Sequence, residues 1–184
     1  MKQNFEILSG LPSYVNMYVS IPENGYTEFS EGLAVKFVKK DNSEWIGNFE
    51  RGNSHLKYAS QLKNSEDILI ISFGICFIMN VESTKPLIQF GFDYKEVYEF
   101  ENSFILIGEY SISIMENINK IKHFDNLCYD GIYNVEINND KLTAILNSYD
   151  SIENKIVKTN FALNLETLEF NETKVQKTWW KIWQ

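Results

Sequence analysis

Cysteine, histidine and arginine are scarce in this sequence of 184 residues. It contains two cysteines, Cys76 and Cys128, two histidines, His55 and His123, and a single arginine, Arg51. A structural zinc ion usually takes four Cys or His ligands, so all of these cysteines and histidines would have to converge from unrelated segments. We therefore expect no metal site. Because the cysteines lack CxxC spacing, we expect both to be buried, reduced thiols.

Cofactor motifs and long apolar runs are also missing. The sequence contains no GxGxxG, GxxxxGK[ST], GxSxG or HExxH pattern, so we expect no common cofactor. The most apolar stretch, residues 68–81, is interrupted by Ser72, Gly74 and Asn80 and is too short for a membrane span of about 18 residues. The first residues carry charges and lack the apolar core of a secretory signal. These absences favour a cytoplasmic protein without a membrane span.

Cations are outnumbered by acids. There are 17 lysines and arginines against 25 aspartates and glutamates, giving a net charge of −8. Nucleic-acid binding depends on many phosphate-neutralising cations and benefits from bidentate arginine, so this composition argues against it. An acidic surface instead steers association with a basic partner. We expect a basic protein partner and no nucleic acid.

Short segments with strand-like patterning recur along the chain, and no Pro/Gly/Ser-rich linker separates them. Hydrophobic residues make up 44% and aromatic residues 15% of the sequence, which suits pleated, half-buried surfaces. The pattern predicts one all-β domain, residues 1–184, of antiparallel sheets in a β-sandwich or curled sheet. The expected strands cover residues 14–21, 33–39, 44–50, 68–73, 75–81, 87–92, 104–109, 111–115, 132–137, 142–146 and 156–165.

Two of these segments have clear patterns. Residues 157–165 alternate apolar and polar side chains, which predicts a strand with one buried and one wet face. Residues 133–137 alternate in the same way and are followed by Asn138, Asn139 and Asp140, which tolerate positive φ. We expect a hairpin there.

An internal similarity appears at an offset of 37 residues. Both copies read as a strand, a tight turn and a second strand, and a period near 40 residues is typical of β-propeller blades. A propeller-like arrangement is therefore an alternative to two ordinary hairpins in a sandwich. The matching residues are Ile68, Leu69, Ile70, Phe73, Ile75 and Ile78 with Ile105, Leu106, Ile107, Tyr110, Ile112 and Met115.

We expect little helix in this chain. Ile118, Ile121 and Phe124 recur at three-residue spacing and would suit one or two helical turns over residues 117–124. Residues 175–184 have similar spacing. Either segment could equally be an irregular strand, so we expect at most one or two short helices.

The segment HFDNLCYDG holds the most catalytic-looking group, formed by His123, Asp125, Cys128 and Asp130. A thiolate nucleophile needs a base within hydrogen-bonding distance. The simpler interpretation is a turn into the next strand, with the cysteine pointing inward. A small hydrolase or lyase that uses His123 or His55 with carboxylates from neighbouring strands remains the rival function, and a pocket that unites such groups would favour it.

An acidic, tyrosine-rich stretch is the candidate protein-binding site. In DYKEVYEFE, acids and aromatic side chains are interleaved, so that charge can steer a basic partner while aromatic rings supply contact area. The alternative is an edge strand that its charges protect from aggregation. The candidate contact residues are Tyr94, Glu96, Tyr98, Glu99 and Glu101.

The last eleven residues combine lysines with Trp179, Trp180 and Trp183. This composition suits a membrane interface, but the segment is too short to anchor a protein alone. We expect it to dock onto the core of the same chain. A further possibility is that it contacts a second copy and so builds a homo-oligomer.

The order of segments between Ile105 and Phe170, namely FILIGEYSISI, YDGI, a short hairpin and KTNFALNLETLEF, resembles a pattern in small bacterial all-β proteins. Some of those proteins lie beside secreted toxins as immunity proteins. The resemblance implies a cytoplasmic protein that neutralises a toxin by binding it, and it transfers no functional residue. Our first hypothesis is a non-enzymatic protein-binding module of this kind. A structural or assembly subunit is a further alternative to the hydrolase or lyase.

Overall fold

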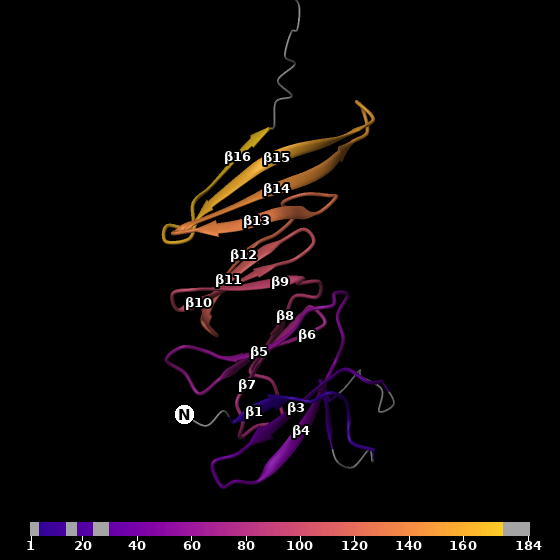
Figure 1. Ribbon diagram of the computed structural model, residues 1–184, viewed down its shortest axis with the longest axis vertical. Coiled ribbons are helices and arrows are strands. Elements are labelled where there is room, and N and C mark those ends of the chain that lie inside the picture. Colours follow the sequence, from indigo (N-terminus) through magenta and orange to yellow (C-terminus); the bar gives the residue numbers. More distant parts are fainter. Residues whose placement is uncertain (1–3, 14–17, 24–29, 175–184) are drawn as a thin grey trace, which may run out of the picture. The chain divides into compact units, whose positions relative to one another are not determined.

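The chain folds as antiparallel-dominated β-sheets in the computed structural model (Figure 1). The structure describes residues 4–13, 18–23 and 30–174, and this part contains sixteen strands and no helix. The predicted all-β class is therefore confirmed. Residues 117–124 form a turn and strand β12 (Lys120–Phe124) rather than the helix considered as an option. None of the described residues belongs to a helix that could cross a membrane.

The strands form four sheets of four strands each. Sheet 1 has the order β1-β3-β4-β2, in which β2 runs parallel to β4. The other three sheets are simple meanders in chain order, with antiparallel neighbours: β5-β6-β7-β8 is sheet 2, β9 to β12 form sheet 3, and β13 to β16 form sheet 4. A four-stranded meander is the unit from which propeller blades are built.

The remaining strand bounds are as follows. Sheet 1 contains β1 (Phe5–Ile7), β2 (Val19–Ile21), β3 (Leu33–Val38) and β4 (Glu44–Phe49), and sheet 2 contains β5 (Lys57–Gln61), β6 (Ile68–Ser72), β7 (Ile75–Met79) and β8 (Ile88–Phe90). Sheet 3 contains β9 (Glu96–Phe100), β10 (Ser103–Ile107) and β11 (Ile112–Asn117) beside β12, and sheet 4 contains β13 (Ile132–Asn138), β14 (Lys141–Asp150), β15 (Lys155–Asn164) and β16 (Phe170–Lys174).

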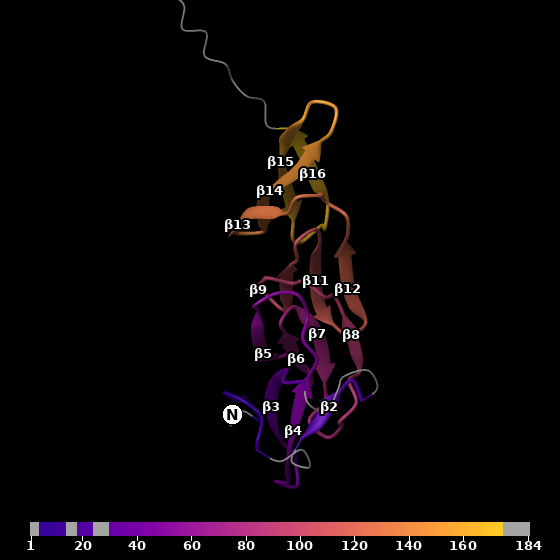
Figure 2. The same ribbon diagram turned by 90° about the vertical axis from the view of Figure 1, so that its right-hand side faces the viewer.

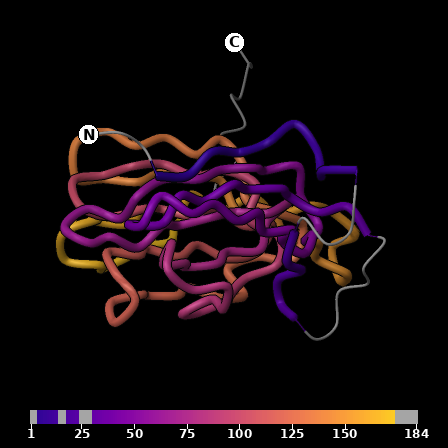
Figure 3. The backbone as a smooth tube through the Cα atoms, turned by 90° about the horizontal axis from the view of Figure 1, so that it is seen from below, coloured from indigo at the N-terminus to yellow at the C-terminus, as the bar shows by residue number. Residues whose placement is uncertain are grey.

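The chain divides into two compact units. The first is Met1–Gly108 with Ile112–His123, and the second is Glu109–Ser111 with Phe124–Gln184. The first unit thus holds sheets 1 to 3, and the second is built around sheet 4. Figure 2 shows the sheets of the first unit as successive layers, and Figure 3 follows the chain back and forth through them. The prediction of one domain over residues 1–184 stays a prediction.

Sheet 2 is buried on both of its faces. Alternate side chains of β6 and β7, including Ile70 and Phe77, join a core with Val35, Phe37 and Phe49 of sheet 1. The intervening side chains join a second core with sheet 3, made by Leu69, Ile71, Cys76 and Ile78 with Phe104, Leu106 and Met115. This double burial explains why β6 and β7 read as nearly continuous apolar runs and not as alternating ones.

Sheet 4 has one buried face and one open face. On β14 and β15 the buried side chains include Leu142, Leu146, Phe161 and Leu163, which alternate with more exposed, mostly polar residues. Phe161 stacks against Phe170 at a ring-centroid distance of 5.7 Å. The one-wet-face pattern and the hairpin expected at residues 138–140 are both confirmed, with Asn139 at a φ of 53° between β13 and β14.

The two copies of the 37-residue similarity are the two central strands of consecutive sheets. The first copy covers β6 and β7 of sheet 2, and the second covers β10 and β11 of sheet 3. Each pair is fully buried over most of its length. The similarity therefore marks equivalent places in two meanders, where both alternating sets of side chains are buried.

Double burial of sheet 2 makes a testable prediction. Leu69 and Ile70 are adjacent and fully buried, but they point to opposite faces of β6. Leu69→Ala and Ile70→Ala should each lower the free energy of unfolding by about 2–5 kcal/mol, because each leaves a cavity in a different core. Urea unfolding provides the measurement. Leu87→Ala is the matched control, since Leu87 is 45% exposed and should change stability by about 0.5 kcal/mol or less. If either buried substitution left the free energy of unfolding unchanged, the corresponding face of sheet 2 would not be packed.

Candidate functional site

Strand β9 carries the core of the predicted protein-binding site and lies at the edge of sheet 3, paired only with β10 among the described strands. Glu96, Tyr98 and Glu99 belong to the strand, and Glu101 lies in the two-residue turn that joins it to β10, at a φ of 50°. Glu99 and Glu101 are exposed, and Glu96 and Tyr98 are half-buried. The predicted site therefore lies on an edge strand. This position also fits the alternative interpretation, in which the charges protect an edge strand from aggregation.

Tyr94 lies in the core and not on this surface. Its side chain is 3% exposed, and its hydroxyl is 2.6 Å from the hydroxyl of buried Ser113 on β11. Its carbonyl accepts a hydrogen bond of 2.5 Å from Ser54. Gly91, at a φ of 70°, leaves room for the ring, because a Cβ there would collide with it. Tyr94 thus fills the core between sheets 2 and 3 and offers no contact area to a partner.

The other candidate residues divide between the two faces of β9. Glu96 and Tyr98 share one face, and the Tyr98 hydroxyl donates to the Glu96 carboxylate. Glu99 lies on the opposite face and accepts a hydrogen bond of 2.7 Å from Tyr58 on β5, the edge strand of sheet 2. The five predicted residues therefore do not form one continuous patch.

Two tyrosines hold these carboxylates through their hydroxyl groups. Burial raises the pKa of Tyr58 to about 12, and the hydrogen bond to Glu99 adds to the shift. Burial, followed by the hydrogen bond to Glu96, raises the pKa of Tyr98 to about 12 as well. Both phenols therefore stay protonated far above neutral pH, and they act as fixed donors to the carboxylates of the edge.

We call the carboxylates of Glu96, Glu99 and Glu101 the acidic edge. Within the described residues none of the three forms an ion pair with a lysine or arginine, although Lys63 donates a hydrogen bond to the backbone carbonyl of Glu101. Other glutamates of the chain do pair with lysines, and these pairs are Glu44 with Lys36, Glu66 with Lys40, Glu116 with Lys120, and Glu153 with Lys155. The three carboxylates of the acidic edge thus form no ion pair with a described lysine or arginine, although the Lys63 ammonium lies beside the Glu101 backbone.

A hydrogen-bonded chain leads from the core to His123. The Ser113 hydroxyl lies 2.6 Å from the Tyr94 hydroxyl and 2.7 Å from His123 Nδ1, and the imidazole packs edge-on against Phe90. A serine beside a histidine resembles a nucleophile and its base, but Ser113 is 0% exposed. The contact therefore orients the imidazole and gives a substrate no access to the serine.

The remaining candidates for chemistry are dispersed. His55 lies in an exposed loop before β5. Cys76 and Cys128 are buried, free thiols, as predicted, and burial raises the pKa of Cys76 well above its usual value. Cys128 lies 3.8 Å from the carbonyl of Glu109. Among the described residues there is no group of three or more histidine, cysteine, aspartate or glutamate side chains that could hold a metal ion.

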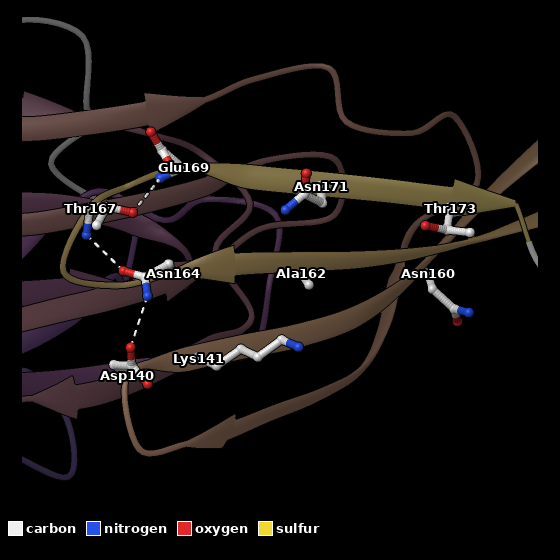
Figure 4. Close-up of a pocket in the computed structure, with 9 residues that line it drawn as sticks. All are labelled: Asp140, Lys141, Asn160, Ala162, Asn164, Thr167, Glu169, Asn171 and Thr173. Atoms are coloured by element: carbon white, nitrogen blue, oxygen red, sulfur yellow. Dashed lines mark hydrogen bonds between the residues drawn. The ribbon is translucent and has the colours of Figure 1, made fainter.

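The open face of sheet 4 carries a polar groove of about 550 Å³ that sequence reasoning missed (Figure 4). Asn164 holds one end, since its amide nitrogen donates to Asp140 at 2.8 Å and its carbonyl accepts from the Thr167 backbone at 2.7 Å. The predicted polar face of β15 could have indicated this groove. Strand β16, which also lines it, was not predicted from the sequence. The groove contains no histidine, and its lining residues are Asp140, Lys141, Asn160, Ala162, Asn164, Thr167, Glu169, Asn171 and Thr173.

The tryptophan-rich segment proposed to form an oligomer contact, residues 175–184, lies outside the described residues. Comparison with known proteins finds no family model that matches the chain and no curated protein similar to it at a significant level. The residues themselves must therefore support any proposal of function.

The Tyr94–Ser113 contact should stabilise the junction of sheets 2 and 3. Ser113→Ala should lower the free energy of unfolding by about 1–3 kcal/mol, because a buried hydroxyl loses its partner. In the double variant with Tyr94→Phe the loss should be smaller than the sum of the two single losses, since both partners are then removed. Urea unfolding of the four proteins measures this coupling. If the loss in the double variant equalled the sum of the two single losses, the predicted coupling would be wrong.

Proposed function

We propose that this protein is a non-enzymatic, cytoplasmic binding module that docks a basic protein partner through the acidic edge. The resemblance of its segment order to immunity proteins leads us to propose further that the partner is a toxin, which the module neutralises by direct binding. The observation that carries the proposal is the grouping of three carboxylates without an ion pair, those of Glu96, Glu99 and Glu101, on one edge strand and the turn that follows it.

Physical reasons support this role for an edge strand. Carboxylates that form no ion pair with the described lysines and arginine can attract a basic partner over roughly 10 Å at physiological ionic strength. Tyr58 and Tyr98 add half-buried aromatic rings beside them, and tyrosine is enriched at the centres of protein interfaces. The net charge of −8 favours the same class of partner.

The role of the acidic edge can be tested by charge reversal. Glu99→Lys with Glu101→Lys should slow association with the basic partner by about tenfold or more at low salt, because electrostatic steering sets the association rate. The control variant, Glu166→Lys with Glu172→Lys, changes the net charge equally at two exposed glutamates of the second unit. It should associate nearly as fast as the unmodified chain.

The partner for this measurement is a protein captured from the source cells by the unmodified chain and by the control variant, but not by the Glu99/Glu101 variant. Its association rate is then followed at several salt concentrations, and it should fall steeply as salt rises. Capture of the same proteins by all three baits, or an association rate that does not depend on salt, would reject docking through the acidic edge.

A further inference from the structure

The outer side of strand β9 presents backbone groups that do not bond to β10. Phe100 and Ser103 are cross-strand partners and close a two-residue turn, so they exchange both of their backbone hydrogen bonds. Because such pairs alternate along an antiparallel ladder, Tyr98 also bonds to β10, whereas the N–H and C=O groups of Val97 and Glu99 point away from it. We call the groups that point away the outer backbone groups.

The surroundings of this side of β9 are well defined. The chain is described without interruption from residue 30 to residue 174, so the segments that lead into and out of β9 are both placed. Within the described strands, β9 pairs only with β10. The carbonyl of Glu101, two residues beyond Glu99, accepts a hydrogen bond from the Lys63 ammonium. A cationic donor therefore already binds the backbone at the end of this strand.

The acidic edge places negative charge on both faces of β9. Glu96 lies on one face and Glu99 on the other. Side chains on the same face of neighbouring strands lie about 5 Å apart, so a strand added here would bring its cationic side chains beside a carboxylate on either face. Glu99 can accept a further bond besides that from Tyr58, since a carboxylate has about four acceptor sites.

We propose that the basic partner docks by adding an extended segment, rich in lysine or arginine, to β9 as a further strand of sheet 3. This inference rests on the proposed function and specifies the form in which the partner binds. The outer backbone groups hydrogen-bond to the added strand, and the acidic edge selects its cationic side chains. Pairing of β9 with β9 of a second copy would bring like charges together, which disfavours the same chain as the occupant.

A synthetic basic peptide tests the chemistry of the added segment. A capped, fluorescently labelled peptide of Lys-Lys-Thr repeats carries lysines on both of its faces when it is extended. Its affinity, measured by fluorescence anisotropy at low salt, should fall about tenfold or more in the variant Glu99→Lys with Glu101→Lys. The control variant, Glu166→Lys with Glu172→Lys, changes two exposed glutamates of the second unit. It should bind the peptide nearly as tightly as the unmodified chain.

Amide hydrogen exchange tests whether the bound peptide forms a strand. In the chain alone, the amides of Val97 and Glu99 should exchange at least about tenfold faster than those of Tyr98 and Phe100, because only the latter two bond to β10. Saturating peptide should slow exchange at Val97 and Glu99 by about tenfold or more. In the Glu99/Glu101 variant, the same peptide concentration should leave the exchange of Val97 unchanged.

The outcomes separate this inference from the proposed function. Peptide binding that depends on Glu99 and Glu101 but leaves the exchange of Val97 unchanged would overturn the added strand, while docking through charge would stand. A peptide that does not bind, or that binds all three proteins equally, would also overturn the inference. The proposed function is decided separately, by the association rate of the captured partner. Slower exchange at Val97 and Glu99, seen only where the acidic edge is intact, is the result expected from the added strand.

Discussion

Sheet 2 must exclude water from both of its faces, and the first unit is organised around that requirement. Its central strands offer Ile70 and Phe77 to sheet 1 and Leu69 and Ile71 to sheet 3. Residues this apolar cannot face water on either side without a large loss of free energy, so sheets 1 and 3 are needed as covers. Side chains with polar roles are consequently displaced to the sheet edges and turns. The acidic edge on β9 is one result of this displacement.

Edge strands also mark the limit of what the sequence reveals. Every interior strand of the four sheets was expected from patterning, whereas β1, β5 and β16 were not, and β9 and β12 were considered only as alternatives. All five lie at sheet edges. Such strands are short and partly exposed, so neither a clear alternation nor a continuous apolar run distinguishes them. The predicted site on β9 was identified by its interleaved acids and aromatic residues. Tyr58, which donates to Glu99 of this site, lies on β5, an edge strand that patterning missed.

The internal similarity was recognised only in strands whose alternating side chains are buried in both directions. Counting 37 residues onward from Ile105 and Leu106 leads to Leu142 and Thr143 on β14. Leu142 is buried like its equivalent, but Thr143 lies on the face that bears the polar groove, where Leu106 packs into a core. Sheet 4 therefore repeats the meander while its open face no longer needs apolar residues. Tyr94 illustrates the converse case, because long-range contacts with Ser113 and Ser54 bury a side chain whose acidic neighbourhood suggested a surface position.

The acidic edge is one solution to a physical problem that every open sheet edge poses. An unpaired strand edge invites other strands, and proteins avoid this with charge or with cover. On β9 three carboxylates repel a second strand of like charge while remaining able to attract a basic surface. The charge on β9 thus protects the edge and at the same time selects which surfaces can approach it.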